Sequence, residues 1–195
     1  MPIDLNVVTE LDRRAVRQSI ELVQKADALE RPTPCAEWNL RQLLAHMSVQ
    51  HRGFAAAAAG HGGDPAVWEM APAADPVGDY IAAAEEVLEA FTNPAPAFTL
   101  PELGGEFPAA QAISFHLVDY VAHGWDVARS LGLPFEPDPE AAAAAFQVVQ
   151  AVPTGAAREV AGAAFAPPVP TAAENVVDQM MALLGRSPTW PDRPA

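Results

Sequence analysis

The sequence of 195 residues contains a single cysteine, Cys35. One thiol forms no disulfide within the chain, and it supplies one sulfur ligand at most. The composition therefore excludes a disulfide-stapled fold and a metal site built from several cysteines.

Basic residues are also scarce, with 11 Lys and Arg against 25 Asp and Glu, a net charge of −14. A general nucleic-acid binder needs Lys and Arg to neutralise phosphates, and docking on an anionic membrane surface needs them too. Apolar runs such as Phe54 to Ala59 are far shorter than the ~20 residues of a membrane span. The first residues lack the basic region and long apolar run of a targeting signal. We therefore expect a cytoplasmic protein that binds neither nucleic acid nor membranes.

The content of hydrophobic residues, 50%, is too high for a disordered chain, although 20 residues are proline. A chain of this length buries about 70% of its unfolded surface, which is enough for a sizeable core. The sequence shows no internal repeat and no long linker. We therefore expect residues 1–195 to form one domain.

Apolar residues recur at helical spacing through most of the chain, which predicts an all-α fold. The last helix is expected to begin at a capping box of Thr171 and Glu174 and to end at Gly185. A short hairpin or irregular excursion is expected over residues 95–108, and a loop over 60–76. The other expected helices cover residues 7–29, 39–58, 76–92, 109–131 and 139–152, the fourth ending at Gly132.

The start of the second helix has a clear mechanism. Asn39 is a suitable N-cap, and Gln42 three residues later completes a capping box. Trp38 and Leu43 stand on either side of the cap at the positions of a hydrophobic staple. This start places His46 near the apolar stripe of the helix, where a lone histidine is more often a satisfied core residue than a ligand.

Four polar residues share one face of the predicted helix 109–131. At ~100° per residue, an arc of roughly 80° holds His116, Asp119, His123 and Asp126. One interpretation is an ordinary solvent-exposed stripe. The other is a metal site, because a carboxylate four residues before a histidine brings both side chains to one ion. Nitrogen and carboxylate ligands suit zinc, nickel, iron or manganese.

Two segments resemble a known family. The segment from Trp38 to His46 is similar to the first motif of the DinB-like superfamily, and more closely to the metal-binding N-terminal domain of mycothiol-dependent maleylpyruvate isomerase. The segment from Asp119 to Asp126 resembles the second motif of that domain. Thr33-Pro34-Cys35 and the ending from Leu184 to Trp190 resemble an actinobacterial subgroup of uncharacterised metal-binding proteins.

The resemblance implies a four-helix bundle, here with extra short C-terminal helices, that holds a divalent metal. Carried over residue by residue, it implies the ligands His46, Asp119 and His123, with Asp119 in place of the glutamate of the isomerase. Three protein ligands leave a position open for water or substrate, as in catalytic sites. Thiol-using members are thought to activate a cofactor thiol on the metal.

Other residues near the motifs have alternative roles. Asp126 orients a ligand ring or is a surface charge, and His116 is a fourth ligand, lines the cavity or faces water. Trp125 is expected to pack near the site, and His51 and His61 to lie on the surface. The lone cysteine is expected to be a small buried residue rather than a nucleophile.

The sequence thus predicts a metal-dependent protein in one of two classes. The first is an enzyme, a thiol-dependent isomerase or transferase that uses a small thiol such as mycothiol and a small electrophile. The second is a non-catalytic metal- or small-molecule-binding protein. Zinc is the expected metal, and the chain is expected to be a monomer or a homodimer. The substrate is not encoded in any motif.

Overall fold

Six α-helices and one β-hairpin form the regular structure of residues 4–35, 38–159 and 165–191, which the computed structural model describes. The helices are α1 (Leu5–Val23), α2 (Leu40–Ala58), α3 (Pro76–Ala90), α4 (Ala109–Leu131), α5 (Pro139–Gln150) and α6 (Val176–Leu183). The strands β1 (Ala97–Leu100) and β2 (Gly105–Pro108) are antiparallel, and short 3₁₀ turns cover Pro65–Trp68, Pro101–Leu103 and Gly155–Arg158. The fold is therefore mostly helical with one small sheet.

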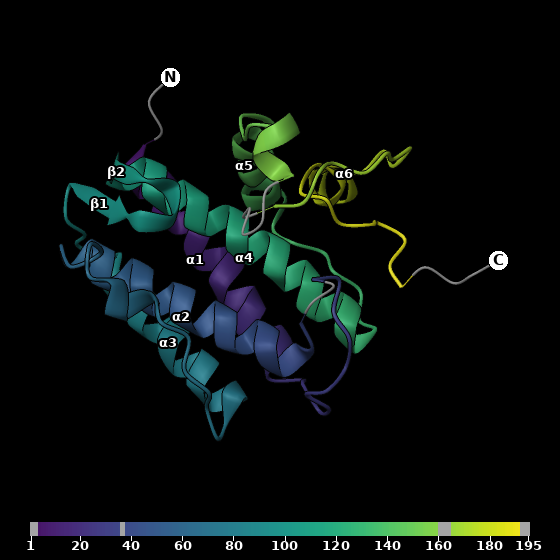
Figure 1. The fold of residues 1–195 in the computed structure, drawn as a ribbon, viewed down its shortest axis with the longest axis horizontal. Helices are drawn as coiled ribbons and strands as arrows, with labels where there is room; N and C mark the ends of the chain where they lie inside the picture. Colours follow the sequence, from purple (N-terminus) through teal and green to yellow (C-terminus); the bar gives the residue numbers. More distant parts are fainter. Residues whose placement is uncertain (1–3, 36–37, 160–164, 192–195) are drawn as a thin grey trace.

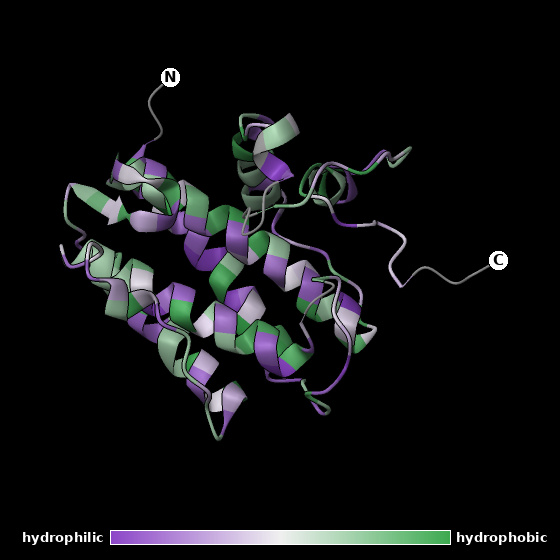
Figure 2. Ribbon diagram, in the orientation of Figure 1, coloured by the Kyte–Doolittle hydropathy of each residue, from purple (hydrophilic) through white to green (hydrophobic). Residues whose placement is uncertain are grey.

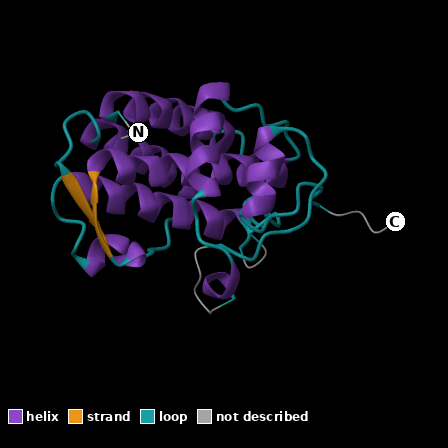
Figure 3. Cartoon of the chain, turned by 90° about the horizontal axis from the view of Figure 1, so that it is seen from above, coloured by secondary structure: helices purple, strands orange, loops and turns teal. Residues whose placement is uncertain are grey.

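The first four helices pack along one another. Helix α1 packs against α4 and α3, and α2 packs against α3 and α4 (Figure 1). The hairpin contacts α2 and α4 and lies at one end of the helices, as the view from above shows (Figure 3). Helix α5 packs on α4, and α6 packs on α5. Helix α4 thus packs against α1, α2, α5 and both strands of the hairpin.

The core lies between the inward faces of these helices. Each helix carries both apolar and polar residues, as expected for helices that are buried on one side (Figure 2). Among the helices of the described ranges, none has the length and apolar character that crossing a membrane requires. The largest fully buried side chains include Trp125, Tyr80, Tyr120, Phe98, Leu40, Leu43, Leu44, Met47 and Ile113.

Several helix boundaries follow from local capping chemistry as the sequence predicts. Asn39 accepts a hydrogen bond from the backbone of Gln42, whose side chain accepts one from Asn39, so the capping box is confirmed. Asp75 caps α3, Asp138 caps α5, and Gly132 ends α4 at φ +71°.

Two predicted boundaries are wrong. Helix α1 ends at Val23 rather than Leu29, because residues 29 and 31 turn away to accept hydrogen bonds from the first amides of α2. Those amides have no partner within their own helix. Helix α6 begins after Asn175, which accepts a hydrogen bond from the backbone of Asp178, so the predicted capping box of Thr171 and Glu174 does not form.

Candidate functional site

Two histidines from α2 and α4 face each other. His46 follows the cap of α2 by two turns, is half-buried, and packs its ring against Trp38 at a centroid distance of 4.5 Å. The ring centres of His46 and His123 lie 5.3 Å apart, with the planes nearly perpendicular at 79°. The structure thus brings together the two histidines that the sequence analysis singles out on separate helices.

The spacing of the two rings fits one shared ion. A zinc–nitrogen bond of about 2.1 Å puts an ion about 3.2 Å from the centre of an imidazole ring. Two such rings at a tetrahedral angle on one ion would have centres about 5.2 Å apart. The observed separation of 5.3 Å is close to this value. The separation of the ring centres of His46 and His123 therefore matches that of two imidazole ligands on one ion.

The polar face of α4 points into the protein. His116 and Asp126 are fully buried, His123 is nearly so, and Asp119 is half-buried. The interpretation of this stripe as a solvent-exposed face is therefore wrong. Burying polar side chains requires partners for them, so each residue of the stripe must be accounted for separately.

Asp126 links His123 to the C-terminal segment. Nδ1 of His123 lies 2.9 Å from Oδ2 of Asp126. The guanidinium of Arg186 donates to both oxygens of Asp126, from Nε at 2.9 Å to Oδ1 and from Nη2 at 2.9 Å to Oδ2. The thiol of Cys35 donates to Oδ2 at 3.2 Å. Asp126 is thus a buried carboxylate, not a surface charge, and it holds the ring of His123 by one nitrogen.

This hydrogen bond determines which nitrogen of His123 is available. With Nδ1 bonded to a carboxylate, Nε2 is the nitrogen that an ion can take. Carboxylate–histidine–metal arrangements of this kind fix the tautomer and the orientation of the ring. The position of Asp126 is therefore the one expected of a residue that orients a metal ligand.

The charges around the two histidines shift their pKa values in opposite directions. Burial, and then the nearby His123 and Arg186, lower the pKa of His46 to about 3, so this ring is neutral at pH 7. Burial also acts to lower the pKa of His123, but the hydrogen bond with Asp126 and the nearby Cys35 outweigh it and raise the pKa to about 10. An ion that binds Nε2 of His123 therefore has to displace a proton.

The two carboxylates of the face also differ. Burial raises the pKa of Asp119, against the nearby His123 and His116. Burial acts in the same direction on Asp126, but Arg186 and His123 outweigh it and hold the pKa of that carboxyl well below its usual range. Asp126 is thus ionised, and both of its oxygens already accept hydrogen bonds, whereas Asp119 is the carboxyl that is able to bind an ion.

In the described part of the chain, one group of three residues has potential metal-ligand atoms within 4.8 Å of one another. The group consists of Cys35, His123 and Asp126. The predicted ligands His46, Asp119 and His123 are not such a set. However, both oxygens of Asp126 already bond to the cationic Arg186. A divalent ion placed at Asp126 would lie beside this guanidinium, and like charges repel strongly where water is excluded. The side of His123 that faces away from Asp126 is therefore the better place for an ion.

A second buried polar cluster occupies the interior between the first four helices. Nδ1 of His116 lies 2.7 Å from Oδ1 of Asp12, and Nε2 of His116 lies 3.1 Å from Nδ1 of His51. The chain continues from Nε2 of His51 to the hydroxyl of Tyr80 at 3.3 Å, and from there to Ser19 at 2.5 Å. We refer to these five residues as the interior chain.

The interior chain corrects two predictions. His51 is 0% exposed rather than on the surface, and its ring stacks on Tyr120 at 3.8 Å. His116 faces neither water nor the histidine pair, because its two ring nitrogens bond to Asp12 and His51. His61 is exposed, as predicted.

Trp125 is buried at 1% exposure, with the guanidinium of Arg129 5.1 Å from the centre of its ring. Cys35 is half-buried. Trp125 thus packs in the core, as expected, whereas Cys35 belongs to the polar cluster, with Sγ 3.2 Å from Asp126 and 3.5 Å from Nη2 of Arg186.

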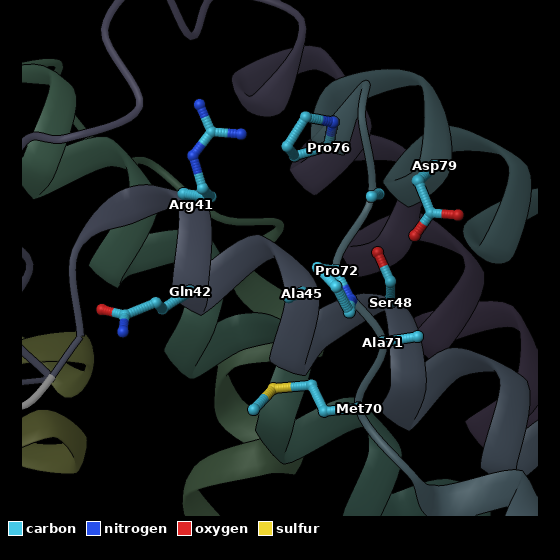
Figure 4. A pocket seen from close by; sticks show the side chains of 10 residues that line it. Arg41, Gln42, Ala45, Ser48, Met70, Ala71, Pro72, Pro76 and Asp79 are labelled. Atoms are coloured by element: carbon cyan, nitrogen blue, oxygen red, sulfur yellow. The ribbon is translucent and has the colours of Figure 1, made fainter.

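Two cavities are lined in part by residues of α2. A cavity of about 230 Å³ is bounded by α2, the first turn of α3 and the segment before it, with Arg41, Ser48, Met70 and Asp79 among its lining residues (Figure 4). A neighbouring cavity of about 430 Å³ shares Ser48 and Asp79 and adds Arg52. The lining residues of these two cavities include none of the predicted metal ligands.

The comparison with known proteins decides the family. Residues 13–128 match the family model of the mycothiol maleylpyruvate isomerase N-terminal domain. The chain belongs to this family. The matched range contains both motifs of the sequence analysis, with His46 in the first and Asp119 and His123 in the second.

Two mycobacterial relatives extend the similarity beyond the family domain. The chain is 31% identical over 175 residues to an uncharacterized protein of Mycobacterium tuberculosis strain CDC 1551 / Oshkosh, MT0763, and equally to one of strain H37Rv, Rv0738. Each alignment covers 84% of this chain and 87% of the relative. No solved structure matches the chain.

Two partners of the α4 face, Arg186 and Asp12, are not predicted from the motifs of the sequence. Arg186 belongs to an ending that resembles an actinobacterial subgroup, which was a signal that this residue has a role. Asp12 is an acidic residue within the buried face of α1, at a position where the helical period calls for an apolar side chain. That mismatch was the available signal for a buried polar partner.

Proposed function

We propose that this protein binds one divalent ion through His46, Asp119 and His123, and uses it to act on a small thiol. The observation that carries the proposal is the pair of rings 5.3 Å apart, one of which is held at Nδ1 by a buried carboxylate. Zinc suits two imidazoles and a carboxylate best, with nickel, iron and manganese as alternatives. In this proposal α1 to α4 form a DinB-like four-helix bundle, and the protein is cytoplasmic.

The residues of the site have distinct tasks in this proposal. His46 offers a neutral ring, and His123 offers Nε2 once its proton has left. Asp119 is shorter than the glutamate of the isomerase by one methylene, so the ion lies closer to α4 or the carboxylate reaches it through a water. Three protein ligands leave room for a further ligand.

When bound, the ion would lower the pKa of a thiol that reaches it and so supply a nucleophile at neutral pH. The charges of the site favour an anionic ligand. Arg186, Asp119 and Asp126 together contribute at most a net charge of about −1 when ionised, and a divalent ion makes the centre positive. A thiolate, such as that of mycothiol, meets this requirement, and the reaction class is isomerisation or transfer of the thiol to a small electrophile.

The binding of the ion is tested by elemental analysis of the full chain without a histidine tag, as purified and after reconstitution with zinc. We expect one ion per chain, and its loss in His46→Ala and in His123→Ala. The matched control is His61→Ala, which removes an exposed histidine from the loop after α2 and should keep the ion. Absence of metal from both preparations of the wild type would overturn the proposal.

The use of a thiol is tested by cobalt substitution in the Cys35→Ser variant, which has no thiol of its own. Adding a small thiol to the cobalt protein should produce a sulfur-to-cobalt charge-transfer band that is absent without the thiol. A cobalt protein whose spectrum does not respond to thiol would leave metal binding standing but refute thiol activation.

A second candidate is a non-catalytic small-molecule-binding protein. The cavity of about 430 Å³ supports it, because its volume lies in the range of small-ligand sites and its lining includes neither His46 nor His123. Ligand binding that survives His46→Ala and His123→Ala, but is lost when Ala45 at the cavity wall is enlarged to Phe, would favour this function.

A further inference from the structure

Arg186 lies at the histidine pair although it is far from it in sequence. It follows α6, whereas His123 and Asp126 belong to α4 and Cys35 precedes α2. Its side chain is only 10% exposed and forms a two-pronged contact with Asp126, which is fully buried. A bidentate guanidinium–carboxylate contact fixes the plane of the carboxylate as well as its charge.

The backbone before Arg186 shows that this placement is specific. Gly185 has φ +80°, a left-handed conformation that favours glycine. A Cβ at Gly185 would lie 2.6 Å from the Cβ of Ala166, so the chain passes too close to a neighbouring segment for any other residue. The amide of Arg186 then donates to the carbonyl of Met181 at 2.9 Å. These contacts direct the guanidinium towards α4.

We propose that Arg186 is a positioning residue for the metal centre and acts through Asp126 on His123. The guanidinium holds Asp126 so that Oδ2 lies 2.9 Å from Nδ1 of His123, which leaves Nε2 directed to the ion. Without Arg186, the buried carboxylate would lose its two-pronged charge-assisted contact, and the plane of the carboxylate would no longer be fixed. This inference rests on the proposed function, since the ion it serves is the one described there.

Two substitutions separate the charge from the geometry. Arg186→Met removes the charge but keeps much of the apolar side-chain volume, and Arg186→Lys keeps the charge without the two-pronged contact. The matched control is Arg129→Met. Arg129 anchors the same terminal segment by donating to the carbonyl of Pro188 at 3.2 Å, but it does not contact Asp126 among the described contacts.

Two measurements are made on each full-length variant. The first is zinc affinity by competition with a chelating dye. We expect Arg186→Met to bind zinc about 10- to 100-fold more weakly, the usual effect of losing a residue that orients a ligand, and Arg186→Lys to lie between it and the wild type. The second is the Nδ1–H signal of His123 in protein with nitrogen-15-labelled histidine. It should move in Arg186→Met, partly recover in Arg186→Lys and stay in place in Arg129→Met.

The outcomes distinguish this inference from the proposed function. An unchanged zinc affinity and an unchanged His123 signal in Arg186→Met would overturn the positioning role and leave the metal site standing. An equal loss in Arg129→Met would also overturn it, because anchoring of the terminal segment would then explain the effect. If the wild type binds no zinc, the proposed function fails, whereas the His123 signal still decides whether Arg186 positions the ring.

Discussion

Replacing His116 by phenylalanine tests whether the interior chain holds the helices together. The ring of His116 is surrounded by the aromatic rings of Phe54, Phe91 and Tyr120, with centroid distances between 4.3 and 5.1 Å. A phenylalanine ring therefore suits the space. What the substitution removes is the partner of Asp12 on α1 and of His51 on α2.

The loss of stability in His116→Phe comes from the buried polar groups that are left without a partner. Asp12 is fully buried, its Oδ2 has no hydrogen-bond partner among the described residues, and burial raises its pKa. Leaving a buried polar group without its hydrogen-bond partner costs about 1–3 kcal/mol. For a chain of this length, 1 kcal/mol corresponds to a shift in Tm of about 2–4 °C. We therefore expect His116→Phe to lower Tm by about 2–12 °C for each of the two groups that it leaves without a partner.

The matched variant removes both members of the pair. Asp12→Leu together with His116→Phe leaves no carboxyl to compensate, but the Nδ1 of His51 still lacks its partner. An unsatisfied buried polar group costs about 1–3 kcal/mol, so the double variant should be more stable than His116→Phe alone. Thermal and urea unfolding followed by circular dichroism compare the wild type, Asp12→Leu, His116→Phe and the double variant.

Additive losses of stability would contradict the pairing of Asp12 with His116. If the two single substitutions destabilise the protein by amounts that sum to the effect of the double variant, Asp12 and His116 do not act as a pair. A loss below about 1 kcal/mol in His116→Phe would likewise show that the interior chain contributes little, as for an exposed ion pair.

Three further predictions concern the metal centre. Because the pKa of His123 is raised to about 10, zinc binding should release about one proton from this ring between pH 7 and 9, and zinc affinity should rise about tenfold per pH unit. Calorimetry in buffers of different ionisation enthalpy measures the number of protons released. A value of zero would refute the prediction. Asp119→Ala should weaken zinc binding more than Asp126→Ala does in the same dye competition, whereas equal losses would show that Asp126 contributes as much as Asp119. Removing the ion with a chelator should leave the helical circular dichroism nearly unchanged. It should remove only the stabilisation that a ligand of the native state provides by mass action, about 2.7 kcal/mol at a free zinc concentration of 100 times Kd. Cooperative unfolding at about 25 °C would instead show that the ion is structural.

The sequence predicts the elements of this fold where the cause is local. The capping box of Asn39 and Gln42, the Asp75 and Asp138 caps and the glycine stop at Gly132 depend on residues a few positions apart. The end of α1 is different. It is determined by residues 29 and 31 pairing with the amides of α2, a contact between two elements that no helical period encodes.

For the site, the sequence predicts which residues share a face but not the direction of that face. The arc from His116 to Asp126 is equally polar whether it meets water or the interior. Its direction is decided by partners elsewhere, Asp12 from α1 and Arg186 from the segment after α6. Such partners lie 60 or more positions away, beyond the reach of any local pattern.

The two buried histidines of this face differ in how the protein occupies their ring nitrogens. Hydrogen bonds to Asp12 and His51 occupy both ring nitrogens of His116. The bond to Asp126 occupies Nδ1 of His123, and the ring centre of His46, from another helix, lies 5.3 Å from that of His123. A buried polar group with all its partners supplied by the protein contributes to stability and to the register of the helices. In the proposed function, His123 rather than His116 is therefore the histidine of α4 that binds the ion, through the ring nitrogen that Asp126 does not hold.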